Sequence, residues 1–366
     1  MKAFLFPGQG SQSRGMGEAL FDSFQPLVQK ADKILGYSIK ELCLEDPRKE
    51  LNQTQFTQPA MYVVSALSYF ASIANPADKP DFVAGHSLGE FNALLAAECF
   101  DFETGLKLVK KRGELMSGAT GGGMAAILGS DKATIERVLQ ANGLNNIDLA
   151  NFNCPSQIVV SGSEEQIMDG YEIFKDAGVK YIPLNTSGAF HSRLMQSSKD
   201  AFEAYLSEFE FADPKIPVIS NVTAQPYLSG QIKTNLVNQI TSSVRWCESI
   251  QYLMAQGDVA FEEVGHGDVL TKLLVKIKKE LPQPCIEASS QATSWLDKIK
   301  DLSTEEKVKL WNETYPISTH VKSTFVDEDK LETRGKAVVL FGHRSAVYMK
   351  GFNGYFDLDQ LVPDNA

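Results

Sequence analysis

Short apolar runs alternate with longer segments of helical spacing through the N-terminal part of the chain. Residues 3–6 form an apolar run that ends at Pro-Gly, and residues 81–84 form a second short run. Such runs predict buried strands. Residues 58–74, 91–97 and 101–117 have apolar residues at helical spacing or are rich in Ala and Leu. Because predicted strands and helices alternate, the pattern favours a parallel sheet covered by helices on both faces.

A second pattern begins after Gly121-Gly122-Gly123. Its predicted strands and helices follow the order βαββαβ, at residues 124–128, 131–141, 147–151, 157–161, 163–177 and 181–184. Ser163 can cap its helix, with Gln166 in the capping-box position. This order over about 65 residues is ferredoxin-like. The sequence therefore predicts a small subdomain, about residues 124–186, inserted into the larger one.

Beyond this subdomain the pattern of the larger unit resumes. The predicted helices and strands lie at residues 197–209, 218–220, 249–256, 260–263 and 269–280. Pro282 and Pro284 then predict a boundary. Residues 282–366 contain one predicted helix at 295–300, a charged stretch and an aromatic-rich segment, a pattern too open for a full domain. We expect one domain over 1–281 and a C-terminal extension over 282–366 that serves as a linker or docking segment.

The composition is that of an ordinary folded protein. Hydrophobic residues make up 43% of the 366 residues and charged residues 22%, which excludes a disordered or collagen-like chain. The 35 basic and 46 acidic residues give a net charge of −11, so nucleic acid and anionic membranes are not expected partners. The apolar run before Pro7 is too short for a signal peptide, and no run approaches a membrane span. We therefore expect a cytoplasmic protein.

Neither a disulfide framework nor a metal site is expected. The cysteines are scattered, odd in number and without a CxxC pair; they are Cys43, Cys99, Cys154, Cys247 and Cys285. The five histidines are single and far apart. This pattern favours reduced thiols in a cytosolic protein and gives no metal-ligand spacing.

The strongest motif is Gly85-His86-Ser87-Leu88-Gly89, a GxSxG sequence between a predicted strand and a predicted helix. In this context the motif forms a nucleophile elbow. The glycines permit a tight turn, and the serine hydroxyl projects near the N–H groups that begin the helix. Chance gives about 0.1 such motif in a chain of this length. A glycine-rich turn with a capping serine is the structural alternative.

A serine nucleophile needs a base, and two histidines are candidates. His191 follows the last predicted strand of the small subdomain, in the sequence GAFHS, and this loop position favours it. His266, in the sequence GHG, is the second candidate. His86 is adjacent to Ser87, and neighbouring side chains on an elbow point apart.

Two further positions suit the binding of negative charge. Gln9 lies between Gly8 and Gly10 directly after the first predicted strand. No lysine follows at the Walker A offset, so an N–H donor for an oxyanion is a better interpretation than a phosphate loop. Arg112 borders the apolar stripe of its predicted helix, and an inward arginine requires a carboxylate or phosphate partner. A structural ion pair with a nearby Asp or Glu is the alternative.

Five motifs, in this order and spacing, resemble those of the malonyl-CoA:acyl-carrier-protein transacylases: GQGSQ, GHSLGE, KRGELM, GAFHS and EVGHGDVL. The resemblance extends over about residues 1–281. Within the family the chain is most similar to the free-standing acyltransferases that serve polyketide synthases without built-in acyltransferase domains. The resemblance implies an α/β-hydrolase-like large subdomain with a parallel sheet and an inserted ferredoxin-like small subdomain, in agreement with the pattern above.

The resemblance also implies roles for individual residues. Ser87 matches the nucleophile that carries the acyl group as an ester, and His191 matches its general base. Gln239 matches the residue whose carbonyl orients that histidine, in a family that uses serine and histidine without a carboxylate partner. The backbone N–H groups of Gln9 and Leu88 match the oxyanion hole.

Substrate recognition is implied by two more positions. Arg112 matches the arginine that pairs with the free carboxylate of malonyl, and Phe190 resembles the malonyl-type form of the motif before the histidine. His266 is a departure, since many relatives have proline there. The implied reaction is a ping-pong transfer of malonyl from malonyl-CoA to the phosphopantetheine thiol of an acyl carrier protein, including carriers in polyketide synthase modules. No cofactor is implied, because malonyl-CoA is a substrate.

Two other functions would use the same residues differently. A proofreading acyl hydrolase would release acyl groups to water and needs no carboxylate clamp, so Arg112 argues against it. A non-catalytic docking subunit is disfavoured by the intact set of Ser87, His191 and Gln9. Within malonyl transfer, fatty-acid synthesis is the alternative to polyketide synthesis.

Overall fold

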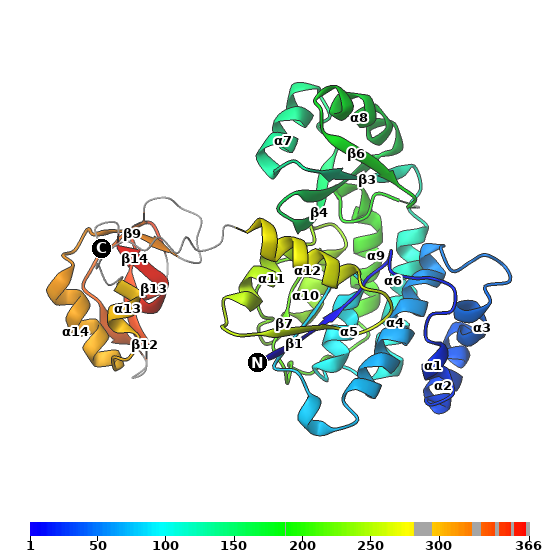
Figure 1. Cartoon of the computed structure of the whole chain (residues 1–366), viewed down its shortest axis with the longest axis horizontal. Helices are drawn as coiled ribbons and strands as arrows, with labels where there is room; N and C mark the ends of the chain where they lie inside the picture. The colour runs from blue at the N-terminus through cyan, green and yellow to red at the C-terminus, as the bar shows by residue number, and fades with distance from the viewer. Residues whose placement is uncertain (187, 282–294, 324–330, 341–343, 353–354, 364–366) are drawn as a thin grey trace. The chain divides into compact units, whose positions relative to one another are not determined.

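A computed structural model of the chain divides into two compact units, Met1–Gln283 and Pro284–Ala366 (Figure 1). The structure describes all residues except 187, 282–294, 324–330, 341–343, 353–354 and 364–366. Within the described residues, no helix is both long and apolar enough to cross a membrane. The four cysteines among them have free thiols, and Cys285 lies outside the described residues.

A parallel four-stranded sheet forms the centre of the large subdomain, in the order β7-β2-β1-β8. Its strands are β1 (Lys2–Phe6), β2 (Phe82–Gly85), β7 (Val218–Ile219) and β8 (Ala260–Glu263). Side chains alternate across β1: Phe4 and Phe6 pack on one face of the sheet, and Ala3 and Leu5 pack on the other. The predicted parallel sheet, buried on both faces, is confirmed.

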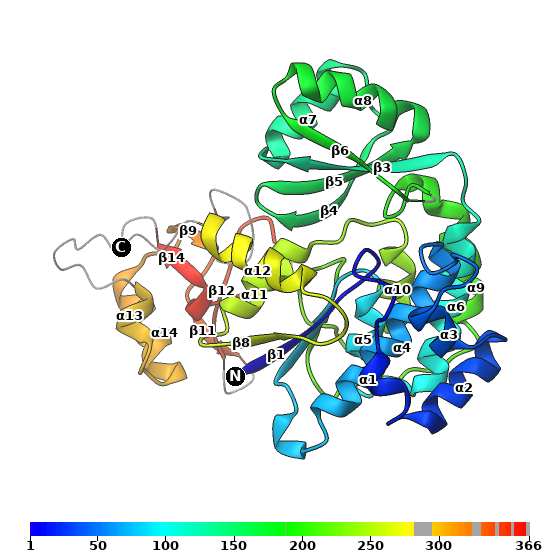
Figure 2. The same ribbon diagram turned by 45° about the vertical axis from the view of Figure 1, so that its right-hand side comes forward.

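Helices cover both faces of this sheet (Figures 1 and 2). The Phe4 face is covered by α1 (Glu18–Phe21), α2 (Gln25–Leu35), α3 (Ile39–Leu44), α4 (Thr54–Ser72), α5 (Gly89–Ala96), α6 (Phe102–Ser117), α9 (Gln196–Leu206) and α10 (Ile232–Gln239). The Leu5 face is covered by α11 (Trp246–Met254) and α12 (Val269–Glu280). Two short 3₁₀ helices, η1 (Pro76–Asp78) and η2 (Arg193–Met195), lie in connections.

The small subdomain has the predicted ferredoxin-like order. Its elements are β3 (Gly122–Leu128), α7 (Lys132–Ala141), β4 (Asp148–Cys154), β5 (Gln157–Ser163), α8 (Glu164–Asp176) and β6 (Lys180–Leu184). The strands form an antiparallel sheet in the order β4-β5-β3-β6. Ala125 and Ile127 pack against the two helices, whereas Met124 and Ala126 on the other face line a pocket. Figure 2 shows the two helices on one face of this sheet.

The predicted cap at the start of α8 forms in part. The Ser163 hydroxyl accepts a hydrogen bond from the Gln166 N–H at 3.3 Å, as expected. The reciprocal bond of a capping box is absent, because Gln166 Oε1 has no hydrogen-bond partner among the described residues. The helix therefore begins with a single serine cap.

The C-terminal unit differs from the expected open segment. The helices are α13 (Trp295–Ile299) and α14 (Thr304–Thr314), with a 3₁₀ turn η3 (Leu358–Gln360). Two antiparallel three-stranded sheets contain β9 (His320–Ser323), β10 (Leu331–Glu332) and β14 (Leu361–Pro363), and β11 (Val338–Leu340), β12 (Arg344–Tyr348) and β13 (Tyr355–Asp357). They enclose a core in which Trp295, Trp311 and Tyr315 pack ring against ring. Strands of two to five residues are too short to show a period in sequence.

Candidate active site

Ser87 lies at the sharp turn between β2 and α5, with a backbone φ of +51°. A Cβ added at Gly85 would lie 2.0 Å from the Gly89 backbone, and one at Gly89 would lie 2.0 Å from the Phe6 carbonyl oxygen. Both positions therefore require glycine. The turn has the geometry of a nucleophile elbow, as the motif predicted.

Asn221 fixes this turn from the end of β7. Its Oδ1 accepts a hydrogen bond from the Ser87 N–H at 2.7 Å, and its Nδ2 donates to the Gly85 carbonyl at 2.7 Å. The Asn221 side chain is fully buried, and its bond to the Gly85 carbonyl is shielded from water. Asn221 was not among the predicted site residues, although its position directly after a buried predicted strand was a readable signal.

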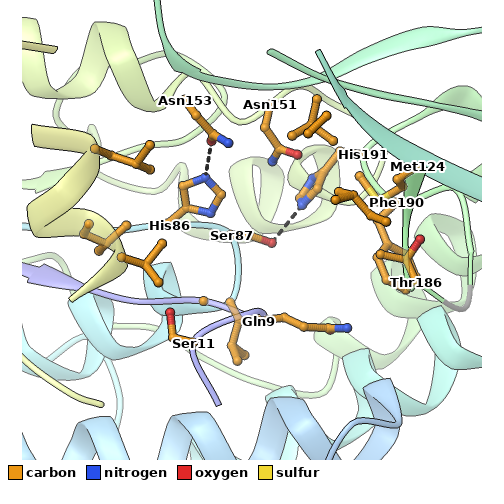
Figure 3. A pocket seen from close by; sticks show the side chains of 18 of the residues that line it. Gln9, Ser11, His86, Ser87, Met124, Asn151, Asn153, Thr186, Phe190 and His191 are labelled. Carbon is orange, nitrogen blue, oxygen red and sulfur yellow. Dashed lines mark hydrogen bonds between the residues drawn. The ribbon is translucent and has the colours of Figure 1, made fainter. Parts of the chain in front are cut away.

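His191 is the histidine that meets Ser87 (Figure 3). Ser87 Oγ lies 2.7 Å from His191 Nε2, and His191 Nδ1 lies 2.9 Å from the Gln239 carbonyl oxygen. Because a carbonyl can only accept, Nδ1 carries the proton and Nε2 is free to accept the proton of the serine hydroxyl. Burial, and then the nearby Arg112 charge, lowers the pKa of His191 to about 3. The imidazole is therefore neutral at physiological pH.

His86 and His266, the second candidate base, have different partners. His86 points away from His191, with its Nε2 2.8 Å from Asn153 Oδ1 (Figure 3). Its pKa is lowered by burial. His266 Nε2 lies 2.6 Å from the Ser13 hydroxyl, and His266 does not line the pocket around Ser87. The geometry thus brings His191, and not His266, to the serine.

Arg112 projects from α6 into the same site and is 1% exposed. Its Nη1 donates to Gln58 Oε1 at 2.8 Å, and its Nη2 donates to Gln239 Oε1 at 2.8 Å and to Ser87 Oγ at 3.1 Å. Burial lowers the pKa of Arg112 to about 10, which still leaves it charged. Within the described residues no carboxylate forms an ion pair with it. The guanidinium therefore has neutral partners beside the serine, unlike the arginine of a structural ion pair.

Gln239 and Glu90 complete a buried network behind the serine. The Gln239 Nε2 group donates to the Ser87 carbonyl at 3.0 Å and also to Glu90 Oε2. Glu90 Oε1 accepts from the Asn221 N–H at 2.9 Å and from the Tyr227 hydroxyl at 2.8 Å. Burial raises the pKa of Glu90 to about 7. Sequence analysis assigned no role to Glu90, although it ends the GHSLGE motif.

These groups open onto a pocket of about 240 Å³ between the two subdomains. The small subdomain lines it with the apolar side chains of Met124 and Ala126, and Phe190 and Leu88 also line it. Figure 3 shows Met124 and Phe190 on the His191 side of Ser87. In the described part of the chain no hydrogen bond uses the backbone N–H of Gln9 or of Leu88. Two free donors thus lie in the wall that also carries the serine.

Known proteins are similar to this chain in sequence and in fold. The family profile described as acyl transferase domain matches residues 3–307. The chain belongs to the acyl transferase family. A polyketide biosynthesis malonyl CoA-acyl carrier protein transacylase of Bacillus subtilis, PksC, is 55% identical over 282 residues, covering 76% of this chain and 98% of that protein.

Solved structures of this acyl transferase family agree. The crystal structure of a malonyl CoA-acyl carrier protein transacylase from Burkholderia pseudomallei matches with a TM-score of 0.76 and 55% identity, covering 77% of this chain and 99% of that one. A malonyl-transacylase in complex with a type II PKS acyl-carrier protein matches with a TM-score of 0.72 and 35% identity. The match covers 76% of this chain and 93% of that one. The resemblance to the transacylases, the subdomain architecture and the expected acyltransferase class are confirmed.

The acyl transferase match extends further than the motifs suggested. It continues to residue 307, inside α14, whereas the sequence resemblance was placed over 1–281. The sequence resemblance was placed on motifs, and the last of them, EVGHGDVL, ends at Leu270. Among the described residues, no group of three or more His, Cys, Asp or Glu side chains could hold a metal ion.

Proposed function

We propose that this acyltransferase moves a malonyl group from malonyl-CoA to the phosphopantetheine thiol of an acyl carrier protein in polyketide biosynthesis. The observation that carries the proposal is the contact of Ser87 with both His191 and Arg112 in one pocket. The serine and histidine supply acyl transfer, and the arginine supplies selection for an acyl group with its own carboxylate. The names of the relatives agree with this assignment.

In the first step, the Ser87 oxygen attacks the thioester carbonyl of malonyl-CoA while His191 Nε2 accepts the hydroxyl proton. The oxyanion accepts hydrogen bonds from the N–H groups of Gln9 and Leu88. When the tetrahedral intermediate collapses, the C–S bond breaks and the proton on Nε2 passes to the CoA thiolate. The products are malonyl-Ser87 and CoA.

In the second step, the thiol of the carrier gives its proton to His191 Nε2 and its sulfur attacks the ester. The C–O bond to Ser87 breaks, and the proton returns to the serine oxygen. The Nδ1–H bond to the Gln239 carbonyl keeps the imidazole in one tautomer and partly stabilises the imidazolium of each step. Neither step requires a metal or a redox cofactor.

Arg112 distinguishes malonyl from simple acyl groups in this scheme. A guanidinium can bind a carboxylate through two parallel hydrogen bonds. Arg112 Nη2 already lies 3.1 Å from the serine oxygen that would carry the acyl group, so the carboxylate of malonyl-Ser87 is within reach of the cation. Phe190 would supply part of the apolar wall on the other side. We also propose that the protein is cytoplasmic, in keeping with its scattered, unpaired cysteines.

The test measures transfer against hydrolysis. The chain is incubated with malonyl-CoA and a holo acyl carrier protein, and malonyl-carrier and free malonate are quantified by chromatography. The proposal predicts that transfer exceeds hydrolysis by at least about tenfold at saturating carrier, and that initial velocities give the parallel lines of a ping-pong reaction. Predominant release of malonate, or of acyl groups from an acylated carrier, would instead identify a hydrolase. Carriers from polyketide and fatty-acid systems, compared side by side, distinguish the two pathways.

A further inference from the structure

Glu90 is a fully buried carboxylate that the proposed reaction does not use. It lies in the first turn of α5, three residues after Ser87, and is 0% exposed. Its two oxygens face hydrogen-bond donors, the Asn221 N–H and the Tyr227 hydroxyl on Oε1 and the Gln239 amide on Oε2. Burying a carboxylate costs folding free energy unless hydrogen-bond donors surround its oxygens. Its position beside the reacting serine therefore needs an explanation.

The contact between Glu90 and Gln239 explains why a carboxylate is buried at this position. An amide side chain has one accepting and one donating end, and its neighbours decide which way it points. Above its pKa of about 7 Glu90 is mainly ionised and can only accept, and the Arg112 guanidinium can only donate. One orientation of the Gln239 amide satisfies both, with Nε2 toward Glu90 and Oε1 toward Arg112 Nη2 at 2.8 Å.

We propose that Glu90 is a positioning residue for substrate selection: it fixes the Gln239 amide and thereby holds Arg112 where the acyl carboxylate is received. The inference rests on the proposed function, since it concerns the same arginine. The amide between Glu90 and Arg112 is essential to the arrangement. A direct ion pair would occupy the guanidinium edge, whereas the neutral amide orients the cation and leaves its charge for the substrate.

A glutamine cannot replace Glu90 in this environment. Both ends of the side chain face a donor, the Asn221 N–H at one oxygen and the Gln239 NH₂ group at the other. Glutamine has only one accepting oxygen. In one orientation its NH₂ group faces the Asn221 N–H, and in the other its NH₂ group faces the NH₂ group of Gln239, so a donor faces a donor in either case. When the two NH₂ groups face each other, the contact is removed only if the Gln239 amide turns by about 180°. Its NH₂ group then points at the Arg112 guanidinium, which is also a donor.

The experiment compares Glu90→Gln with wild type and with a matched control, Tyr227→Phe. The control removes a donor to the same carboxylate but keeps the contact of Glu90 with Gln239. For each protein, kcat/KM is measured with malonyl-CoA and with acetyl-CoA, and Ser87 reactivity is measured separately as the rate of inactivation by a neutral organophosphonate. The phosphonate has no carboxylate, so it reports the serine–histidine pair alone.

We expect Glu90→Gln to lower the malonyl-to-acetyl ratio of kcat/KM by at least about tenfold while the phosphonate rate stays within about threefold of wild type. Tyr227→Phe should keep the ratio within about threefold. An equal loss for both thioesters would make Glu90 a structural core residue. A rise in the ratio would mean that its charge merely weakens Arg112. Either result overturns the inference.

A second variant covers the case in which Glu90→Gln does not fold. Glu90→Asp keeps a buried carboxylate but withdraws it by one methylene from Gln239, so the ratio should fall by at least about threefold, and an unchanged ratio overturns the inference. Wild type is measured first. If it shows no malonyl transfer or no malonyl preference, the proposed function fails; if only the variants leave the ratio unchanged, the inference alone fails.

Discussion

Single residues set the chemistry of the pocket through the partners they lack as much as through those they have. Arg112 is buried, yet within the described residues its hydrogen bonds go to uncharged oxygens of Gln58, Gln239 and Ser87. A buried cation with neutral partners is costly in free energy, and an arriving carboxylate relieves that cost. The same site offers no such relief to an acyl group without a carboxylate. In the proposed reaction, this asymmetry is the source of selectivity for malonyl.

Arg112→Ala should therefore relax or invert the preference for malonyl-CoA over acetyl-CoA. A charge-assisted hydrogen bond in a desolvated site is worth about 1.5–3 kcal/mol, so kcat/KM for malonyl-CoA should fall by about 10- to 100-fold or more. The value for acetyl-CoA should change much less, because Ser87 and His191 remain. Paired kinetics, with folding checked by circular dichroism, measure both. If both values fall equally, Arg112 has only a structural role.

The lowered pKa of His191 leads to a second prediction, on the pH dependence of Ser87 reactivity. Its pKa is lowered from 6.5 to about 3, chiefly by burial, so Nε2 stays unprotonated as the pH falls through 6.5. The rate of Ser87 inactivation by a neutral organophosphonate should stay within about twofold from pH 7.5 to 5.5, whereas a histidine of ordinary pKa would lose about tenfold. A decline with a midpoint near 6.5 would show that the imidazole is not shielded in this way.

The sequence predicted the site residues whose signals are local, and it missed those that are explained by partners far away in the chain. Ser87 and Arg112 carry their signals locally, in a glycine motif between strand and helix and on the edge of an apolar stripe. The structure brings them together with His191, as expected. Glu90 and Asn221 were missed because a buried polar residue is explained only by its partners, and these are more than 130 residues apart in the chain. Asn221 directly follows a predicted strand and Glu90 ends the GHSLGE motif, but neither sign identifies the partner in the other segment.

At the scale of elements, the parallel sheet gathers the site at one edge. Gln9, Ser87 and Asn221 each follow the carboxyl end of a strand, β1, β2 and β7 respectively. Neighbouring parallel strands end at the same edge, so these three residues meet although the chain separates them widely. The small subdomain then covers this edge with the apolar face of its own sheet. The alternation of strands and helices predicted the parallel sheet and the inserted subdomain, but not which residues meet at this edge.

Helix α12 borders the pocket and is the proposed docking element for the carrier. Leu270 and Leu273 line the pocket from its inner face, while the outer face exposes Lys272, Lys276, Lys278 and Lys279. Carrier proteins are usually acidic, and this chain is acidic as well, so docking needs a local basic surface. Lys272 is already paired with Asp268, which leaves the other lysines as the stronger candidates.

Reversal of Lys276 and Lys279 to Glu should raise KM for the carrier by about tenfold or more and leave KM for malonyl-CoA unchanged. The matched control is the reversal of Lys30 and Lys33, which lie on α2, carry the same total charge and do not line the pocket. Steady-state kinetics with varied carrier give both constants. Unchanged carrier kinetics, or an equal effect of the α2 reversal, would remove α12 from consideration.

At the scale of the whole molecule, the chain contains two units with separate hydrophobic cores. Each residue that lines the Ser87 pocket belongs to Met1–Gln283. The C-terminal unit was interpreted as open because its strands are short and its core depends on aromatic packing, a property that shows no period in sequence. Its role as a linker or docking segment stays a prediction.

A chain that ends at residue 283 should acylate itself as fast as the full chain, within about twofold, because removing the second core leaves the first intact. Labelling by malonyl-CoA is compared for the two proteins after circular dichroism shows that both are folded. A folded truncated chain that no longer labels would make the C-terminal unit part of the catalytic unit. That result would agree with the family match that extends to residue 307.

The most direct test of the account is intact-protein mass spectrometry in two stages. Incubation with malonyl-CoA should add the mass of one malonyl group, and peptide mapping should locate it on Ser87. Addition of a holo carrier protein should then return the enzyme to its original mass and shift the same mass to the carrier, and Ser87→Ala should show neither change. A malonyl group on another residue, or one that leaves the enzyme as free malonate without appearing on the carrier, would contradict transfer through a Ser87 ester.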